Sequence, residues 1–115
     1  CGANDLVNGG GDCLVVMPLR PGRLANRLPF VTSPARRLRG VATDRGWLAP
    51  AVPGSDLQIA AVMAEPGKEA DAVRDIQALC DWPIQASPNL RRIDVPSASE
   101  LAAVRAFDPA RVLLS

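Results

Sequence analysis

Short apolar runs separated by proline and glycine predict the strands of a sheet. Residues 13–17 are continuously apolar and rich in β-branched side chains, and Pro18 closes the run. Such a run is typical of a strand that is buried on both faces of a parallel sheet. Residues 57–63 predict another strand, and residues 84–95 predict an extended segment that is interrupted at Pro88.

Two segments have helical patterns. From 68 to 80, apolar residues recur at helical spacing and charged residues occupy the opposite face. The apolar stripe consists of Ala70, Val73, Ile76, Leu79 and Cys80. Ser97 and Glu100 have the spacing of a capping box, which predicts a second helix that ends at Asp108. Its apolar face consists of Leu101, Ala103 and Val104, and residues 111–114 follow as a further predicted strand.

The stretch from 18 to 53 contains too many prolines and glycines for one long helix, so several short elements must share it. Residues 28–32 predict a short edge strand. A cap at Ser33 and a left-handed stop at Gly40 predict a short helix over residues 34–39.

Alternating strands and helices in the second half favour right-handed crossovers onto a mostly parallel sheet. The predicted fold class is α/β. We expect one small two-layer or three-layer domain over residues 12–115, after a flexible lead-in over residues 1–11. No Asn-Gly or Asp-Gly pair occurs within residues 12–115, so the pattern contains no hairpin signal. No apolar run approaches the roughly 18 residues of a membrane-spanning helix.

Composition restricts the chemistry. The 115-residue chain contains no histidine and no tyrosine, which excludes a histidine base, an imidazole metal ligand and a catalytic tyrosine. The cysteines, Cys1, Cys13 and Cys80, show no Cys-x-x-Cys spacing, which argues against a zinc site. We therefore predict no metal, no cofactor and no catalytic residue. An enzyme that uses Cys1, Cys13 or Arg23 ranks last among the hypotheses.

Positive charge is concentrated in the first half of the chain. Seven arginines and a single acid lie between 20 and 45, although the net charge of the chain is +1. Because a guanidinium can grip phosphate or carboxylate with two hydrogen bonds, this segment predicts a surface for an anionic ligand or a protein partner. The predicted binding residues are Arg20, Arg23, Arg27, Arg36, Arg37, Arg39 and Trp47. The alternative is an ordinary solvated surface in a chain whose only lysine is Lys68.

Trp47 stands beside the arginine-rich segment and offers a stacking surface for a base. Aromatic residues make up only 3% of the chain, which is weak support for nucleic acid as the ligand. A tryptophan at this place also suits a core or interface anchor. Acidic residues gather between 56 and 81, and a basic and an acidic face on one small chain favour a homo-oligomer.

Cys1 and the residues that follow it, Gly-Ala-Asn-Asp, resemble the mature end of a bacterial lipoprotein. The resemblance implies that Cys1 is lipidated and that the domain lies in the cell envelope; otherwise we expect a cytoplasmic domain. Two alternatives remain, a Cys1 nucleophile that uses its own amino group as base, and a fragment that begins at a cysteine.

Residues 10–18, Gly-Gly-Asp-Cys-Leu-Val-Val-Met-Pro, resemble the first motor strand of RecQ-type helicases. Residues 30–34 resemble the next strand of that family, which ends in Ser-Pro. The resemblance implies a phosphate-binding loop at residues 19–24. That loop has Arg23 where the family has lysine and Leu24 where it has a hydroxyl, so the resemblance implies a decayed nucleotide-binding domain without ATP hydrolysis.

Three functional hypotheses follow. The first is a non-catalytic binding domain that uses the arginine-rich surface for an anionic ligand or a protein. The second is a lipid-anchored bacterial envelope domain, and the third is a decayed helicase-like domain.

Overall fold

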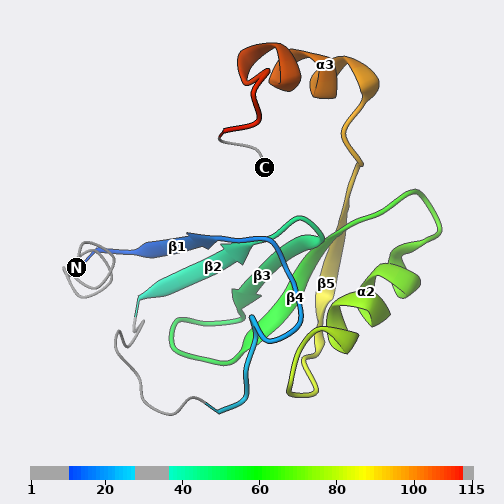
Figure 1. Cartoon of the computed structure of the whole chain (residues 1–115). Helices are drawn as coiled ribbons and strands as arrows, with labels where there is room; N and C mark the ends of the chain where they lie inside the picture. Colours follow the sequence, from blue (N-terminus) through cyan, green and yellow to red (C-terminus); the bar gives the residue numbers. More distant parts are fainter. Residues whose placement is uncertain (1–10, 28–36, 113–115) are drawn as a thin grey trace.

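A five-stranded mixed sheet forms the body of the protein (Figure 1). The structure is a computed structural model that describes residues 11–27 and 37–112. The strands are β1 (Cys13–Val16), β2 (Leu38–Ala42), β3 (Gly46–Pro50), β4 (Leu57–Met63) and β5 (Ala86–Ile93), and they lie side by side in chain order. The pairs β1–β2 and β4–β5 are parallel, whereas β2–β3 and β3–β4 are antiparallel. The helices are α2 (Glu69–Ala78) and α3 (Ala98–Phe107). The predicted α/β class is confirmed, with parallel pairing at both ends of the sheet.

The core lies on one face of the sheet, beneath α2 and the loop that follows β1. Val41, Leu48, Ile59 and Val62 project from the central strands toward this side, and all four are buried. Ile76 is the buried residue of α2. The remaining members of the cluster come from the loops and strand ends, and they are Leu19, Leu24, Ala64 and Ile84.

A bulge explains how Ile59 and Val62 reach the same face. Trp47 pairs with Ala61 and Leu48 pairs with Ile59, so β4 contains one extra residue at this point. Strand side chains normally alternate between faces, and one inserted residue reverses that alternation. The bulge therefore lets both ends of β4 contribute to one core.

The turn between β2 and β3 is built on Thr43 rather than on an Asn-Gly pair. The Thr43 hydroxyl accepts hydrogen bonds from the backbone N–H groups of Arg45 and Gly46 and donates one to the Gly46 carbonyl at 2.9 Å. A Cβ atom at Gly46 would lie 2.2 Å from the Ala61 carbonyl oxygen, so this position requires glycine. The antiparallel β2–β3–β4 unit therefore forms without the hairpin signal that the sequence lacked.

Most elements of the second half are confirmed. The strand over 57–63 matches β4, and the two predicted helices match α2 and α3 within two residues at each end. The capping box of α3 is present, because Ser97 accepts from Glu100 N–H and the Glu100 carboxylate accepts from Ser97 N–H at 2.7 Å. The extended segment around Pro88 becomes β5.

Three predictions about local structure are wrong. The strand at 13–17 is not buried on both faces, because the Leu14 and Val16 side chains are 64% and 83% exposed. The helix over 34–39 fails at its end, since Leu38 and Arg39 belong to β2. Arg111 and Val112 are not in a strand. Residues 34–36 and 113–114 of those two segments, the predicted strand over 28–32 and most of the lead-in lie outside the described residues.

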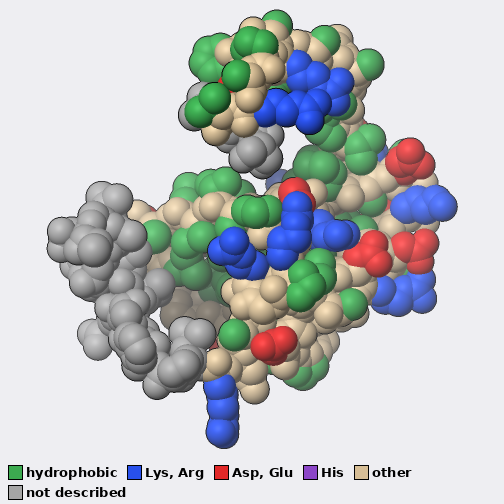
Figure 2. Space-filling model, viewed as in Figure 1, with side chains coloured by type: hydrophobic (Ala, Val, Ile, Leu, Met, Phe, Trp, Pro, Cys, Tyr) green, Lys and Arg blue, Asp and Glu red, His purple; other side chains and the backbone are tan. Residues whose placement is uncertain are grey.

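α3 stands apart from α2 and the rest of the body (Figures 1 and 2). None of its residues is buried, and its Leu101, Val104 and Phe107 side chains are exposed. Asp108 is the buried polar residue at its end, where its carboxylate accepts from Val112 N–H at 3.0 Å. Within the described parts of the chain, no helix has the length and apolar character needed to cross a membrane.

We expect Leu48→Ala to lower the free energy of unfolding by about 2–5 kcal/mol, because it leaves a cavity beneath α2. Leu48 is fully buried at the centre of the sheet. Val52→Ala is the matched control, since Val52 is 61% exposed and its truncation should change stability by less than about 0.5 kcal/mol. Urea unfolding followed by circular dichroism measures both. Equal effects of the two substitutions would contradict a core on this face.

Candidate functional site

The loop after β1 presents arginine side chains from an anchored backbone. Leu19 and Leu24 are buried in the core, and the Leu24 carbonyl accepts a hydrogen bond from Asp81 N–H at 3.0 Å. Gly22, with a φ of 82°, supplies the left-handed residue of the turn in which Arg23 N–H donates to the Arg20 carbonyl. Leu19 and Leu24 point inward, whereas the arginines of the loop are exposed.

Arg20 binds within the protein. Its guanidinium donates to the Asp44 carboxylate at 2.6 Å and to the Leu19 carbonyl at 2.7 Å. The other Asp44 oxygen accepts from Leu19 N–H at 2.8 Å. Asp44 therefore ties the loop to the β2–β3 turn, and the first of the predicted ligand-binding arginines has a structural partner.

The same contacts set the acidity of Asp44. Burial raises the pKa of this carboxyl, but the hydrogen bonds from Arg20 and Leu19 N–H and the charge of Arg20 together outweigh burial, so the pKa lies below its usual value. Since hydrogen bonds favour the charged form here, Asp44 remains a carboxylate at neutral pH.

The other predicted arginines fall into separate groups. Arg39 lies on β2 and pairs with Asp12 at 3.1 Å. Arg37 precedes β2, where its carbonyl accepts from Cys13 N–H. Arg36 lies outside the described residues. The exposed side chains of Arg23 and Arg27 form no hydrogen bond or ion pair with the described residues.

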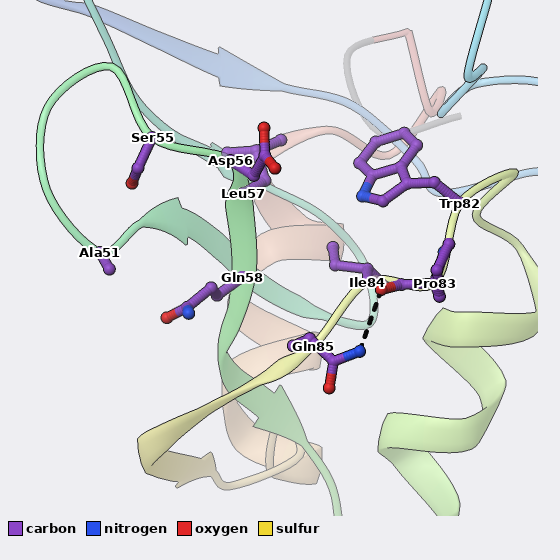
Figure 3. Close-up of a pocket in the computed structure, with 9 residues that line it drawn as sticks. All are labelled: Ala51, Ser55, Asp56, Leu57, Gln58, Trp82, Pro83, Ile84 and Gln85. Atoms are coloured by element: carbon purple, nitrogen blue, oxygen red, sulfur yellow. Dashed lines mark hydrogen bonds between the residues drawn. The ribbon is translucent and has the colours of Figure 1, made fainter.

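A hollow of about 330 Å³ lies between the start of β4 and the chain that leads into β5 (Figure 3). Trp82 forms one side of it, and it directly follows Asp81, the residue that is hydrogen-bonded to the loop at Leu24. Asp56 and Leu57 at the start of β4 lie on the other side, and Gln85 lies below them, where its amide donates to the Pro83 carbonyl at 3.2 Å. The hollow therefore combines an indole surface with carboxylate and amide groups, a combination suited to a flat heterocycle.

The sequence pattern does not predict this hollow. Asp56 and Trp82 are 26 positions apart in the sequence, and only the parallel pairing of β4 with β5 brings the start of β4 beside the chain that enters β5. The one available signal was the Trp82-Pro83 pair directly after a predicted helix.

Trp47 lies on the opposite face of the sheet from the anchored loop. It pairs with Ala42, whereas the neighbouring Leu48 and Val41 pair on the core side. The Trp47 indole lies over Gly40, where an added Cβ atom would come within 2.1 Å of the ring. The structure therefore does not bring Trp47 together with Arg20 and Arg23.

The described cysteines, Cys13 and Cys80, are free thiols. Burial raises the pKa of Cys80, and the charge of Asp81 raises it further, against a hydrogen bond from the Trp82 backbone that lowers it. Cys80 is therefore a thiol at neutral pH, and the thiol is a weaker nucleophile than the thiolate. Within residues 11–27 and 37–112, no group of three or more cysteine or acidic side chains is placed to hold a metal ion. Cys1 lies outside the described residues.

Comparison with known proteins gives a fold but no family. No family model and no curated protein matches the chain. Among solved structures, glutaconate coenzyme A-transferase from Acidaminococcus fermentans is similar, with a TM-score of 0.76 and 17% identity. The match covers 99% of this chain and 48% of that chain, so this chain spans about half the length of the transferase chain. The likeness establishes a shared fold. The resemblance to RecQ-type helicases is not tested by these comparisons and stays a prediction.

We expect Asp44→Asn to lower the free energy of unfolding at pH 7. The substitution should also remove part of the loss of stability that occurs as the pH falls. The folded-state pKa of Asp44 is lowered, so its contribution is present above the unfolded pKa of about 3.9 and is lost as the pH falls through the folded value. The difference in unfolding free energy between wild type and variant should therefore be constant from about pH 5 to 7 and shrink below about pH 4.

Urea unfolding at a series of pH values measures this difference. Arg20→Gln is the companion variant, because removing the guanidinium should weaken the same acid dependence. Both side chains of the pair are about half exposed, so we expect a modest effect. A difference that grows as the pH falls would contradict the assignment.

Proposed function

We propose that this domain is a non-catalytic binding module of a coenzyme A-transferase-like protein, and that it holds the phosphate-bearing part of a coenzyme A-type ligand. The observation that carries the proposal is the position of Arg23. Its exposed guanidinium extends from a loop whose backbone is fixed by Leu24, and that loop is hydrogen-bonded to the chain entering Trp82.

The ligand chemistry fits this arrangement. Coenzyme A combines a purine ring with phosphate groups, and guanidinium groups bind phosphate through paired, charge-assisted hydrogen bonds. An indole surface with nearby amide and carboxylate groups can stack against a purine and hydrogen-bond to its edge. Since Leu19 and Leu24 already order the loop, binding costs less conformational entropy than a mobile loop would require.

A binding role is also consistent with the side chains of the site. Asp44 is occupied by Arg20 and Leu19 N–H, and the raised pKa of Cys80 keeps that thiol protonated. The chain contains no histidine to act as a general base near neutral pH. The proposal therefore gives this domain the task of holding the ligand, with no reaction step.

Isothermal titration calorimetry with coenzyme A tests the proposal. Charge-assisted hydrogen bonds contribute roughly 1.5–3 kcal/mol each, so we expect Arg23→Gln to weaken binding about tenfold or more. Arg27→Gln should act in the same direction, and Trp82→Leu should weaken binding through loss of stacking. Arg105→Gln is the matched control, because it removes the same charge from an exposed position on α3.

Two fragments of coenzyme A test which part of the ligand is bound. Pantetheine lacks the phosphates and the purine and should not bind, whereas 3′,5′-ADP should retain part of the affinity. If Arg23→Gln and Arg105→Gln weakened coenzyme A binding equally, the effect would come from net charge alone. That result would contradict a binding site at Arg23. Tighter binding of a single-stranded oligonucleotide than of coenzyme A would favour nucleic acid as the ligand.

A further inference from the structure

The chain around Leu24 runs parallel to the chain that leaves α2. Leu24 forms a parallel β-bridge with Cys80. In a parallel pair, the residues that follow on the two chains continue in the same direction. Arg27 therefore follows the bridge toward the side of Trp82, whereas Arg23 precedes the bridge, on the side where α2 ends.

Two guanidiniums of this loop are available to a ligand. Arg20 is held by its ion pair with Asp44, whereas Arg23 and Arg27 are exposed and form no hydrogen bond or ion pair with the described residues. They lie on either side of the buried Leu24, and four residues span at most about 14 Å of extended chain. Two separate guanidiniums on one anchored segment can bind two separate phosphate groups of one ligand.

The hollow at Trp82 has no cation of its own for a phosphate. Its lining, as far as the chain is described, includes the carboxylate of Asp56 and amide groups, but no lysine or arginine (Figure 3). A purine can stack on the indole there, but the phosphates of the same ligand need positive charge from outside the hollow. The bridge at Leu24 makes Arg27 the first loop arginine on the Trp82 side and Arg23 the next.

The groups of coenzyme A have an order that can be compared with the order of the arginines. The adenine ring is joined to a ribose that bears the 3′-phosphate, and the diphosphate and the pantetheine arm continue from the 5′ position of that ribose. With the purine on Trp82, the 3′-phosphate stays close to the ring and the diphosphate extends away from it. From the hollow outward, Arg27 therefore corresponds to the 3′-phosphate and Arg23 to the diphosphate.

We propose that Arg27 binds the 3′-phosphate of the ligand and Arg23 its diphosphate, so that the site prefers coenzyme A to dephospho-coenzyme A, which lacks the 3′-phosphate. This inference rests on the proposed function and deepens it, because it gives each arginine a different phosphate. A phosphate monoester carries a charge of about −1.5 to −2 at pH 7, and a guanidinium can bind it through two parallel hydrogen bonds. Removal of the 3′-phosphate therefore removes the partner of Arg27 alone.

Isothermal titration calorimetry with coenzyme A and with dephospho-coenzyme A tests this assignment. We expect the wild type to bind coenzyme A about tenfold or more tightly than dephospho-coenzyme A. Arg27→Gln should weaken binding of coenzyme A and leave dephospho-coenzyme A nearly unchanged, so that the ratio of the two affinities falls toward one. Arg23→Gln should weaken binding of both ligands by similar factors and keep the ratio. Arg105→Gln, at an exposed position on α3, is the matched control and should also keep it.

Arg27→Lys keeps the charge but lacks the planar fork, so it should retain part of the preference for coenzyme A. An affinity ratio that Arg27→Gln leaves unchanged would overturn the assignment, and so would a ratio that Arg23→Gln abolishes. Equal binding of the two ligands by the wild type would also overturn it. In these three cases coenzyme A still binds and the proposed function stands. If the wild type bound neither ligand, the proposed function would fail and this inference with it.

Discussion

Burial of Leu19 and Leu24 against one face of the sheet is the contact on which the other features depend. These two residues bring the loop after β1 into the same cluster as Ile76 of α2 and Ile84. A buried loop must satisfy its backbone polar groups. Leu19 N–H donates to Asp44 and the Leu24 carbonyl accepts from Asp81, so the apolar anchors and the hydrogen bonds fix the same short segment. With Leu19 and Leu24 facing inward, the arginines between and beyond these two anchors are exposed.

The asymmetry of the sheet follows from this one-sided coverage. The central antiparallel strands are held by the Thr43 turn and by the bulge in β4, which turn their large apolar residues toward α2. On the other face, Trp47 covers Gly40 and small residues such as Ala42 and Ala61 surround it. The outward residues of β1, Leu14 and Val16, remain largely exposed on this face. β1 therefore carries more apolar side chains than the described part of the chain buries.

The sequence predicts those parts of the fold that depend on local patterns. The apolar strand at 57–63, the amphipathic stripe of α2 and the Ser97–Glu100 capping box each specify an element through neighbouring residues, and each is confirmed. Coverage of β1 and the identity of β2 depend on partners distant in the sequence. The β2 strand contains a glycine that suggests a helix stop, but Gly40 is required there because the Trp47 ring lies against it.

The candidate site was predictable only in its charge. Seven arginines in one segment predict an anionic ligand. The sequence does not predict that Arg20 forms an ion pair with Asp44 and Arg39 with Asp12. Those pairings depend on where the β2–β3 turn and the start of β1 lie in space. The periodicity of apolar residues does not predict these positions. The Trp82 hollow depends on the β4–β5 crossover in the same way. Charge is a property of composition, whereas availability of a charged group for a ligand is a property of the fold.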